Sequence, residues 1–218
     1  MPPNADLEAL RKAQIIDAAL RTIAERGCTD VTMDDICKEA GLSKGGLAHY
    51  YKSKNDLFKA AFQEFFQRIF IRGDETMSTF SDPLEQVLSF EWLYNKNDPD
   101  VDTGYPILYD FMSIAVHDQE YRNIFSDWVN GWVRLLSKAI RIGQSQGRYE
   151  NVNAESAART ISAIYQGIAT RWFLAPDKHS TEWAVESLRR SVRGLLDSYE
   201  NNFCKERRKK AKRVKANK

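Results

Sequence analysis

The sequence predicts an all-α protein in which a small N-terminal headpiece of three helices precedes a larger helical bundle. Side chains that cap helix N-termini stand before apolar residues at helical spacing, and glycines and prolines separate the helical segments. No alternating strand pattern appears in the second half of the chain. A length of 218 residues is sufficient for a headpiece and a body with its own core.

The first helix is predicted from about residue 6 to residue 26. Its apolar residues recur at helical spacing, and Gly27 follows as a stop signal. This stripe is expected to pack across the next two helices, which begin after Val31. Arg11 and Lys12, near its start, could reach a phosphate or could equally form a solvated pair.

Residues 31–58 contain three helix starts that can be recognised from side-chain chemistry. Thr32 and Ser53 are each followed three residues later by an aspartate, which is the capping-box pattern. Ser43 can cap a helix that begins at Lys44. Because each cap stabilises a helix by about 1 kcal/mol, local chemistry already favours two short helices and the start of a third.

Gly41 stands where the first of these short helices must end in a left-handed residue, and Ser43 starts the next helix almost at once. Two helices joined by so short a turn cross steeply, as in a helix-turn-helix, whose second helix enters the DNA major groove. No acid occurs in residues 43–55, whereas lysines, a histidine and tyrosines do. A helical hairpin with a solvated lysine face is the alternative, and DNA binding is favoured.

This segment resembles the DNA-binding domain of the TetR family of bacterial and archaeal regulators. The residues that carry the resemblance are Thr32, Ile36, Ala40, Gly41, Ser43, Lys44, Gly45, Leu47, Tyr50, Tyr51, Lys54 and Leu57. The resemblance implies phosphate contacts by Thr32, Tyr50 and Lys54, and a position near bases or the backbone for Lys44, Gly45 and His49. The predicted DNA-binding set is Thr32, Ser43, Lys44, Gly45, Gly46, His49, Tyr50 and Lys54. Ala48 and Gly46 depart from the family pattern, which often has an aromatic residue and a Thr or Ser there.

The rest of the chain predicts further helices at about residues 54–71, 81–93, 104–116, 119–146, 153–174 and 180–203, with a polar, turn-rich segment at 95–103. Gly73 is predicted to break or bend the first of these. We divide the chain into a DNA-binding domain (1–54), a helical ligand-binding and dimerisation domain (55–204) and a basic, flexible tail (205–218). The tail is either a solvated end or a DNA-tethering arm.

Aromatic residues on several body helices predict a cavity for an apolar or aromatic small molecule, because Trp and Tyr bring polar atoms that a dry core must satisfy. A plain aromatic core is the alternative. The predicted ligand-binding residues are Trp92, Tyr105, Tyr109, Met112, Trp128, Trp132, Tyr165, Gln166 and Trp172. Asp110, His117 and Arg171 are further candidate polar anchors.

The last two helices have more apolar circumference than packing on one side would use. A symmetric four-helix interface between two copies would bury the excess, with a monomeric bundle as the alternative. The predicted dimer interface is Ala158, Ile161, Trp183, Leu188, Val192, Leu195 and Tyr199.

Composition limits the remaining possibilities. The net charge of +2 divides into +8 in residues 205–218 and −6 before them, so the body is not a general polyanion binder. Neither a signal peptide nor a run of eighteen apolar residues is seen, which predicts a cytoplasmic location. Cys28, Cys37 and Cys204 lack metal-binding spacing and are expected to be free thiols, with a redox sensor as a weaker alternative.

These observations together predict a transcriptional regulator without a cofactor, most simply a ligand-released repressor that binds a palindromic operator as a homodimer. A DNA-organising or cell-cycle protein of the same fold, with no small-molecule effector, is the alternative. A helical enzyme is disfavoured, because none of the three histidines has spacing typical of a catalytic triad or metal site.

Overall fold

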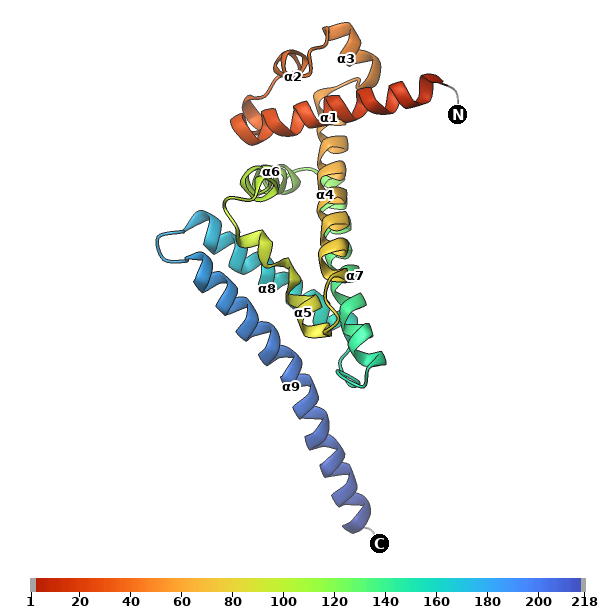
Figure 1. Cartoon of the computed structure of the whole chain (residues 1–218), viewed down its shortest axis with the longest axis vertical. Coiled ribbons are helices and arrows are strands. Elements are labelled where there is room, and N and C mark those ends of the chain that lie inside the picture. Colours follow the sequence, from red (N-terminus) through yellow and green to blue (C-terminus); the bar gives the residue numbers. More distant parts are fainter. Residues whose placement is uncertain (1–2, 217–218) are drawn as a thin grey trace. The chain divides into compact units, whose positions relative to one another are not determined.

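The computed structural model describes the backbone of residues 3–216 and the side chains of residues 6–199, and within these limits the fold is all-α, as predicted. The helices are α1 (Pro3–Asp30), α2 (Met33–Ala40), α3 (Lys44–Tyr50), α4 (Lys54–Ser78), α5 (Pro83–Leu88), the 3-10 helix η1 (Ser89–Tyr94), α6 (Pro99–Ala115), α7 (Gln119–Ser145), α8 (Ala154–Leu174) and α9 (Thr181–Ala216) (Figure 1). The basic segment 205–218, predicted as a tail, lies outside the described side chains. None of the described helices is long and apolar enough to cross a membrane.

The predicted caps form as the sequence indicates. Thr32 and Asp35 make a reciprocal capping box at the start of α2, and the Ser43 hydroxyl accepts a hydrogen bond from the Gly46 N–H at the start of α3. Gly41 ends α2 in the left-handed conformation, with φ 65°. Gly27 likewise has φ 78° and interrupts the regular geometry of α1, which confirms the predicted stop.

Several boundaries in the body differ from the prediction. The helix predicted at 81–93 is divided into α5 and η1, and α9 continues past residue 203 to Ala216. The helix α4 does not break at Gly73 but continues to Ser78. A Cβ atom at Gly73 would lie 3.0 Å from Leu135 Cδ2 and 3.1 Å from Phe90 Cε1, so this glycine permits close packing. The helix α6 begins at Pro99, inside the segment predicted as a turn, because the Asp98 side chain accepts a hydrogen bond from the Asp100 N–H and caps it.

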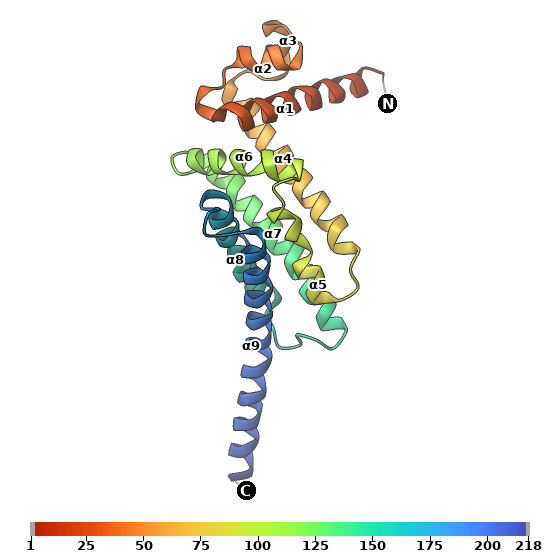
Figure 2. The same ribbon diagram turned by 60° about the vertical axis from the view of Figure 1, so that its left-hand side comes forward.

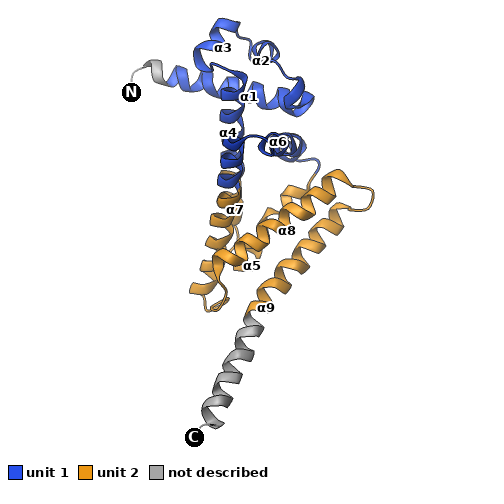
Figure 3. Cartoon of the chain, turned by 180° about the vertical axis from the view of Figure 1, so that it is seen from behind, with its two compact units in different colours: residues 1–69, 96–128 blue, residues 70–95, 129–218 orange. Residues whose placement is uncertain are grey.

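The chain divides into two compact units (Figure 3), which are residues 1–69 with 96–128, and residues 70–95 with 129–218. In the first unit, α2 packs on α1 and α3 packs on α2 (Figure 1). Phe62 of α4 packs edge-on against Phe111 of α6 and Tyr121 of α7. The first unit therefore extends past residue 54, where the predicted DNA-binding domain ends. That boundary stays a prediction about function.

The core of the second unit is also aromatic. Phe90 packs edge-on against Trp132 and Tyr165, and Tyr94 packs in the same way against Trp172. The helices α8 and α9 lie side by side in this unit (Figure 2). The buried residues of α9 recur at helical spacing, and exposed residues lie between them.

Candidate functional site

The helix-turn-helix is held in shape by contacts between the three N-terminal helices. The Leu42 N–H donates to the Cys37 carbonyl at 2.9 Å, which closes the turn after α2. Gln14 of α1 donates from Nε2 to the Ala40 carbonyl at 2.7 Å and so fixes the end of α2 on α1. Ile36, Ala40 and Leu47 are buried beneath the turn. The exposed side of α3 is thus presented on a rigid support.

Two of the predicted DNA-binding residues serve first as caps. The Thr32 N–H and hydroxyl both donate to Asp35 Oδ2, at 2.9 and 2.6 Å. These bonds and the Arg26 guanidinium lower the pKa of Asp35 to about 2. The Ser43 hydroxyl oxygen lies 3.1 Å from the Gly46 nitrogen. Both hydroxyls therefore stand at helix N-termini, where phosphate oxygens are readily bound.

The two lysines of the predicted set, Lys44 and Lys54, both have partners within the chain. The Lys44 side chain is 77% exposed, and its ammonium lies 2.6 Å from Asp34 Oδ2, which raises the pKa of Lys44. The Lys54 ammonium lies 3.5 Å from the Thr29 carbonyl oxygen and 5.1 Å from the Phe58 ring centre. Lys44 can accordingly turn toward a ligand only at the cost of one exposed ion pair, whereas Lys54 contacts residues inside its own unit.

The remaining predicted residues lie on α3 itself. The rings of His49 and Tyr50 pack edge to face with their centres 5.0 Å apart. A Cβ atom at Gly45 would meet nothing within 4 Å, whereas one at Gly46 would lie 3.3 Å from the Ser43 hydroxyl. Nothing inside the described fold requires glycine at position 45. A close approach by an external molecule would require it.

Sequence reasoning missed Gln14 and Asp34. Each joins two helices that are separate in sequence, Gln14 across α1 and α2 and Asp34 across α2 and α3. The sequence of α1 shows Gln14 only as a polar residue beside the apolar stripe. Its partner, the Ala40 carbonyl, belongs to the backbone of another helix and leaves no mark in the residue types. Asp34 and Asp35 are adjacent acids in the first turn of α2, and the sequence alone does not show that only Asp34 reaches Lys44 of α3.

Comparison with known proteins supports this arrangement. A sequence profile of bacterial regulatory proteins of the tetR family matches residues 15–61, and one of the BetI-type transcriptional repressor C-terminal domain matches residues 103–197. The chain belongs to the TetR family. TetR-family proteins are transcriptional regulators that bind DNA and are not enzymes.

Individual relatives differ in how much of the chain they match. The HTH-type transcriptional regulator BetI of Stenotrophomonas maltophilia is 26% identical over 209 residues, which cover 89% of this chain and 95% of that protein. BetI of Cronobacter sakazakii is 36% identical over 67 residues, so the match spans only 33% of its length.

Solved TetR-type structures share the fold. A putative transcriptional regulator from Saccharomonospora viridis in complex with choline has a TM-score of 0.72 at 21% identity, over 87% of this chain and 96% of that one. A TetR transcription regulator from Haloarcula marismortui also has a TM-score of 0.72, at 24% identity, over 88% and 98% of the two chains.

The predicted ligand-binding residues fall into two sets, one in each compact unit. The set in the first unit is Tyr105, Tyr109 and Met112 on α6 and Trp128 on α7. The rings of Tyr105 and Tyr109 are stacked with their centres 6.1 Å apart, and Trp128 packs on Phe66 at 4.4 Å. Burial raises the pKa of Tyr105, so its hydroxyl stays protonated.

The set in the second unit is Trp92, Trp132, Tyr165, Gln166 and Trp172, and part of it is internal structure. The Tyr165 hydroxyl donates to the Val87 carbonyl at 2.8 Å, and the Trp172 Nε1–H donates to the Thr181 hydroxyl at 3.0 Å. The Trp92 Nε1–H is buried and has no hydrogen-bond partner, while the Arg72 guanidinium lies 3.8 Å from the ring centre. Trp92 is therefore the member of this set that most needs an external acceptor.

Asp110, a candidate ligand anchor, has an internal partner. Its Oδ2 accepts a hydrogen bond from the Cys28 N–H at 2.6 Å, just after the left-handed Gly27. The carboxylate thus stabilises the end of α1 from α6 within the first unit. Its neighbours on α6 include Tyr109 and Phe111.

The predicted dimer residues divide by burial. Ala158, Ile161, Leu188 and Val192 are fully covered within the single chain, so in this conformation they have no surface to offer a partner. These four residues belong to the core of the second unit in the single chain, and their place in a dimer interface stays a prediction. Trp183, Leu195 and Tyr199 are partly exposed on α9 and remain candidates.

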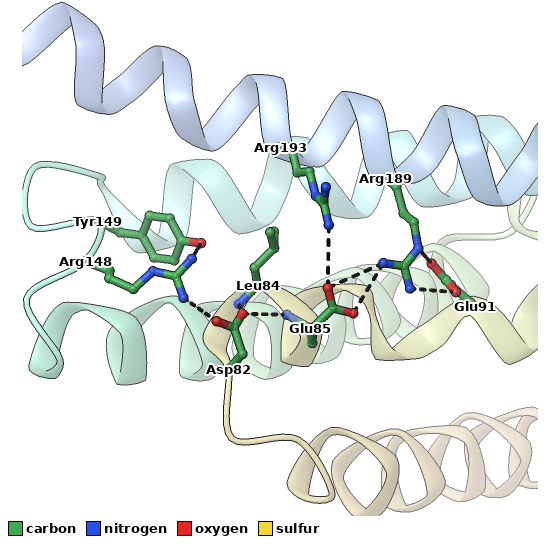
Figure 4. A network of polar contacts seen from close by, with 8 residues as sticks. All are labelled: Asp82, Leu84, Glu85, Glu91, Arg148, Tyr149, Arg189 and Arg193. Carbon is green, nitrogen blue, oxygen red and sulfur yellow. Dashed lines mark hydrogen bonds and ion pairs between the residues drawn. The ribbon is translucent and has the colours of Figure 1, made fainter.

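An ion-pair network fixes α9 on the short helices α5 and η1 (Figure 4). The Arg189 guanidinium lies 2.5 Å from Glu91 Oε1 and 3.3 Å from Glu85 Oε2, and Arg193 lies 3.7 Å from Glu85 Oε1. Glu91 and Glu85 raise the pKa of Arg189. A surface groove of about 690 Å³ runs beside this network, lined by Glu182, Val185, Glu186, Arg189, Arg190 and Arg193.

The two cysteines among the described side chains do not favour a redox sensor, and Cys204 lies outside the described side chains. Cys28 and Cys37 are both buried. Burial raises the pKa of the Cys28 thiol to about 12, with the Asp110 carboxylate as the second cause, and burial also raises the pKa of Cys37. Within residues 6–199, no cluster of three or more His, Cys, Asp or Glu side chains could hold a metal ion.

Proposed function

We propose that this TetR-family regulator is a ligand-released repressor that acts in the cytoplasm and binds a near-palindromic DNA operator as a homodimer. The observation that carries the proposal is the N-terminal turn of α3, where the cap at Ser43, the 77% exposed Lys44 and the uncovered Gly45 occur together, one turn after the capped helix α2. Helix N-termini bind phosphates, and a lysine can donate to guanine O6 or N7 in the major groove.

The homodimer is proposed for two reasons. One helix-turn-helix reads too few base pairs for a specific site, and a two-fold dimer places two of them about one DNA turn apart. The helix α9 also exposes Trp183, Leu195 and Tyr199 in part, which supplies apolar area for a symmetric contact. The groove beside Arg189 lies on the same helix.

The effector is proposed to be a small molecule that binds among aromatic residues. The structural neighbour from Saccharomonospora viridis was solved with choline, and the C-terminal profile that matches this chain is BetI-type. Aromatic faces bind quaternary ammonium groups through cation–π attraction, and they also bind apolar rings. Choline and a panel of apolar aromatic compounds are therefore the first ligands to test. The Trp92 Nε1–H in the second unit is one candidate polar contact, and the Tyr105 hydroxyl in the first unit is a separate candidate.

Release would occur by a population shift. An effector that binds a DNA-incompetent conformation about 100-fold more tightly than the competent one weakens operator binding by roughly 2.7 kcal/mol. The helix α4, which begins beside the helix-turn-helix and contributes residues to both units, is the proposed connection.

The DNA-binding part is tested by selecting an operator from random duplexes with the full-length protein. The variants Lys44→Ala and Tyr50→Ala are expected to lose operator retention at physiological salt, because each removes a predicted DNA contact. Lys178→Ala removes the same charge as Lys44→Ala from an exposed loop of the second unit and is expected to bind as the wild type does. Full affinity in Lys44→Ala would refute the assignment of that residue.

The effector part is tested by titrating choline and the aromatic panel into the protein–operator complex. Release by one compound, weakened in Trp92→Phe or Tyr105→Phe, supports the proposal. Specific release by none of them, together with occupancy of many genomic sites, would favour the DNA-organising alternative. Sedimentation of the free protein as a monomer, with Trp183→Ala unchanged from wild type, would refute the homodimer.

A further inference from the structure

The contact that distinguishes the α3 surface is the ion pair between Asp34 and Lys44. It joins the first turn of α2 to the first residue of α3, with the Lys44 Nζ atom 2.6 Å from Asp34 Oδ2. Both side chains are exposed, at 60% for Asp34 and 77% for Lys44. The exposed cation at the first residue of α3 is thus held by an acid from the neighbouring helix.

Other lysines of the acid-free segment 43–55 have different partners. Lys52 donates to the Ala48 carbonyl at 3.1 Å, and Lys54 donates to the Thr29 carbonyl. Among the described side chains, Asp34 is the carboxylate recorded within ion-pair distance of a cation in this segment. Asp34 therefore neutralises the charge of Lys44, whereas Lys52 and Lys54 contact uncharged carbonyl groups.

Asp34 is not needed for the cap of α2. The neighbouring Asp35 makes the capping box with Thr32 and also pairs with Arg26 at 2.6 Å. An exposed aspartate beside a DNA-facing surface also repels phosphates. Asp34 is therefore expected to lower the affinity for DNA, so another role must explain why an acid stands at this position.

We propose that Asp34 is a specificity-determining residue, which restrains Lys44 and weakens binding to non-operator DNA more than binding to the operator. The inference rests on the proposed DNA contact of Lys44. Non-specific complexes are held almost entirely by phosphate contacts, and the Asp34 carboxylate both repels a phosphate and competes with it for the Lys44 ammonium. In the operator complex, an ammonium with three donors keeps its bond to Asp34 and gives another to a base edge.

The test compares wild type and Asp34→Asn on the selected operator and on a duplex of unrelated sequence, each over a range of salt concentrations. Asp34→Asn is expected to bind the unrelated duplex two- to five-fold more tightly, about the effect of one exposed charge pair. The slope of log affinity against log salt should steepen by about 0.9 on that duplex, because Lys44 gains a phosphate. The operator affinity should change less, so the ratio of the two affinities falls.

Two further variants separate this effect from a general change of charge. Glu39→Gln removes the same charge from the same helix, where Glu39 pairs with Arg21 at 2.8 Å and not with the α3 surface. It should leave the affinity ratio at the wild-type value. In a Lys44→Met background, Asp34→Asn should no longer raise the affinity for the unrelated duplex by more than Glu39→Gln does.

The outcomes are distinguishable. If Lys44→Met weakens operator binding but Asp34→Asn matches Glu39→Gln on both duplexes, Asp34 has no role in specificity and the inference fails alone. Equal gains on both duplexes also overturn it. If Lys44→Met binds both duplexes as the wild type does, the proposed DNA contact of Lys44 fails as well. Thermal unfolding of each variant confirms that folded protein was compared.

Discussion

The hydrogen bond from the Cys28 N–H to Asp110 makes a sharp prediction about stability. The donor and acceptor are 2.6 Å apart, Cys28 is 7% exposed, and Gly27 before it has φ 78°. Asp110→Ala leaves this N–H without a partner in a site largely closed to water. The expected loss is about 1–3 kcal/mol in the free energy of unfolding. Asp110→Asn keeps an acceptor oxygen and should lose less than half as much.

Urea unfolding, followed by far-ultraviolet circular dichroism, measures this difference. Asp127→Ala is the matched control, because Asp127 is an exposed residue of α7 in the same unit. A second readout is the thiol of Cys28, whose pKa is raised to about 12 by burial and by the Asp110 carboxylate. In Asp110→Ala that pKa should fall but stay above the ordinary value, since burial remains. An Asp110→Ala variant no less stable than Asp127→Ala would refute the reasoning.

Three further predictions concern glycines and thiols. Gly45→Ala should raise the stability of the free protein by up to about 1 kcal/mol, because the added Cβ meets nothing within 4 Å. The same variant should weaken operator binding. Unchanged binding would show that DNA does not approach the backbone at position 45. Gly131→Ala should lower the free energy of unfolding by about 1–3 kcal/mol, because its Cβ would lie 2.2 Å from Phe70 Cζ. An unfolding titration measures this loss, which Phe70→Leu should partly relieve. Gly194→Ala is the control, because a Cβ at Gly194 meets nothing within 4 Å. In a Cys204→Ser variant, Cys28 and Cys37 should react with a thiol reagent at pH 8 only at the rate of unfolding, and rapid labelling of the native protein would contradict their burial.

The elements near the N-terminus were predictable because their signals are local. A cap such as Thr32 or Ser43 acts on backbone groups two or three residues away, so the residue types themselves record it. The left-handed Gly27 and Gly41 were recognised for the same reason. Asp98 and Pro99 carried an equally local signal, which the polar composition of the surrounding segment concealed.

The glycines inside the body could not be assigned in this way. A glycine such as Gly73 often ends a helix, but here it leaves room for the side chains of Leu135 and Phe90, which are distant in sequence. Tyr165 and Trp172 look like ligand-binding aromatics until their polar atoms are seen to bond to Val87 and Thr181. A polar atom on an aromatic ring shows a need for a partner without showing where that partner lies.

The sequence by itself determined the all-α class, the helix-turn-helix and its family, because periodicity, caps and turns depend on residues close together in the chain. Only the tertiary structure decided that Leu188 and Val192 are core, that Asp110 supports α1, and that Asp34 holds Lys44. Each of these depends on which side of a helix faces which neighbour. Long-range packing sets that choice, and a single sequence does not record it.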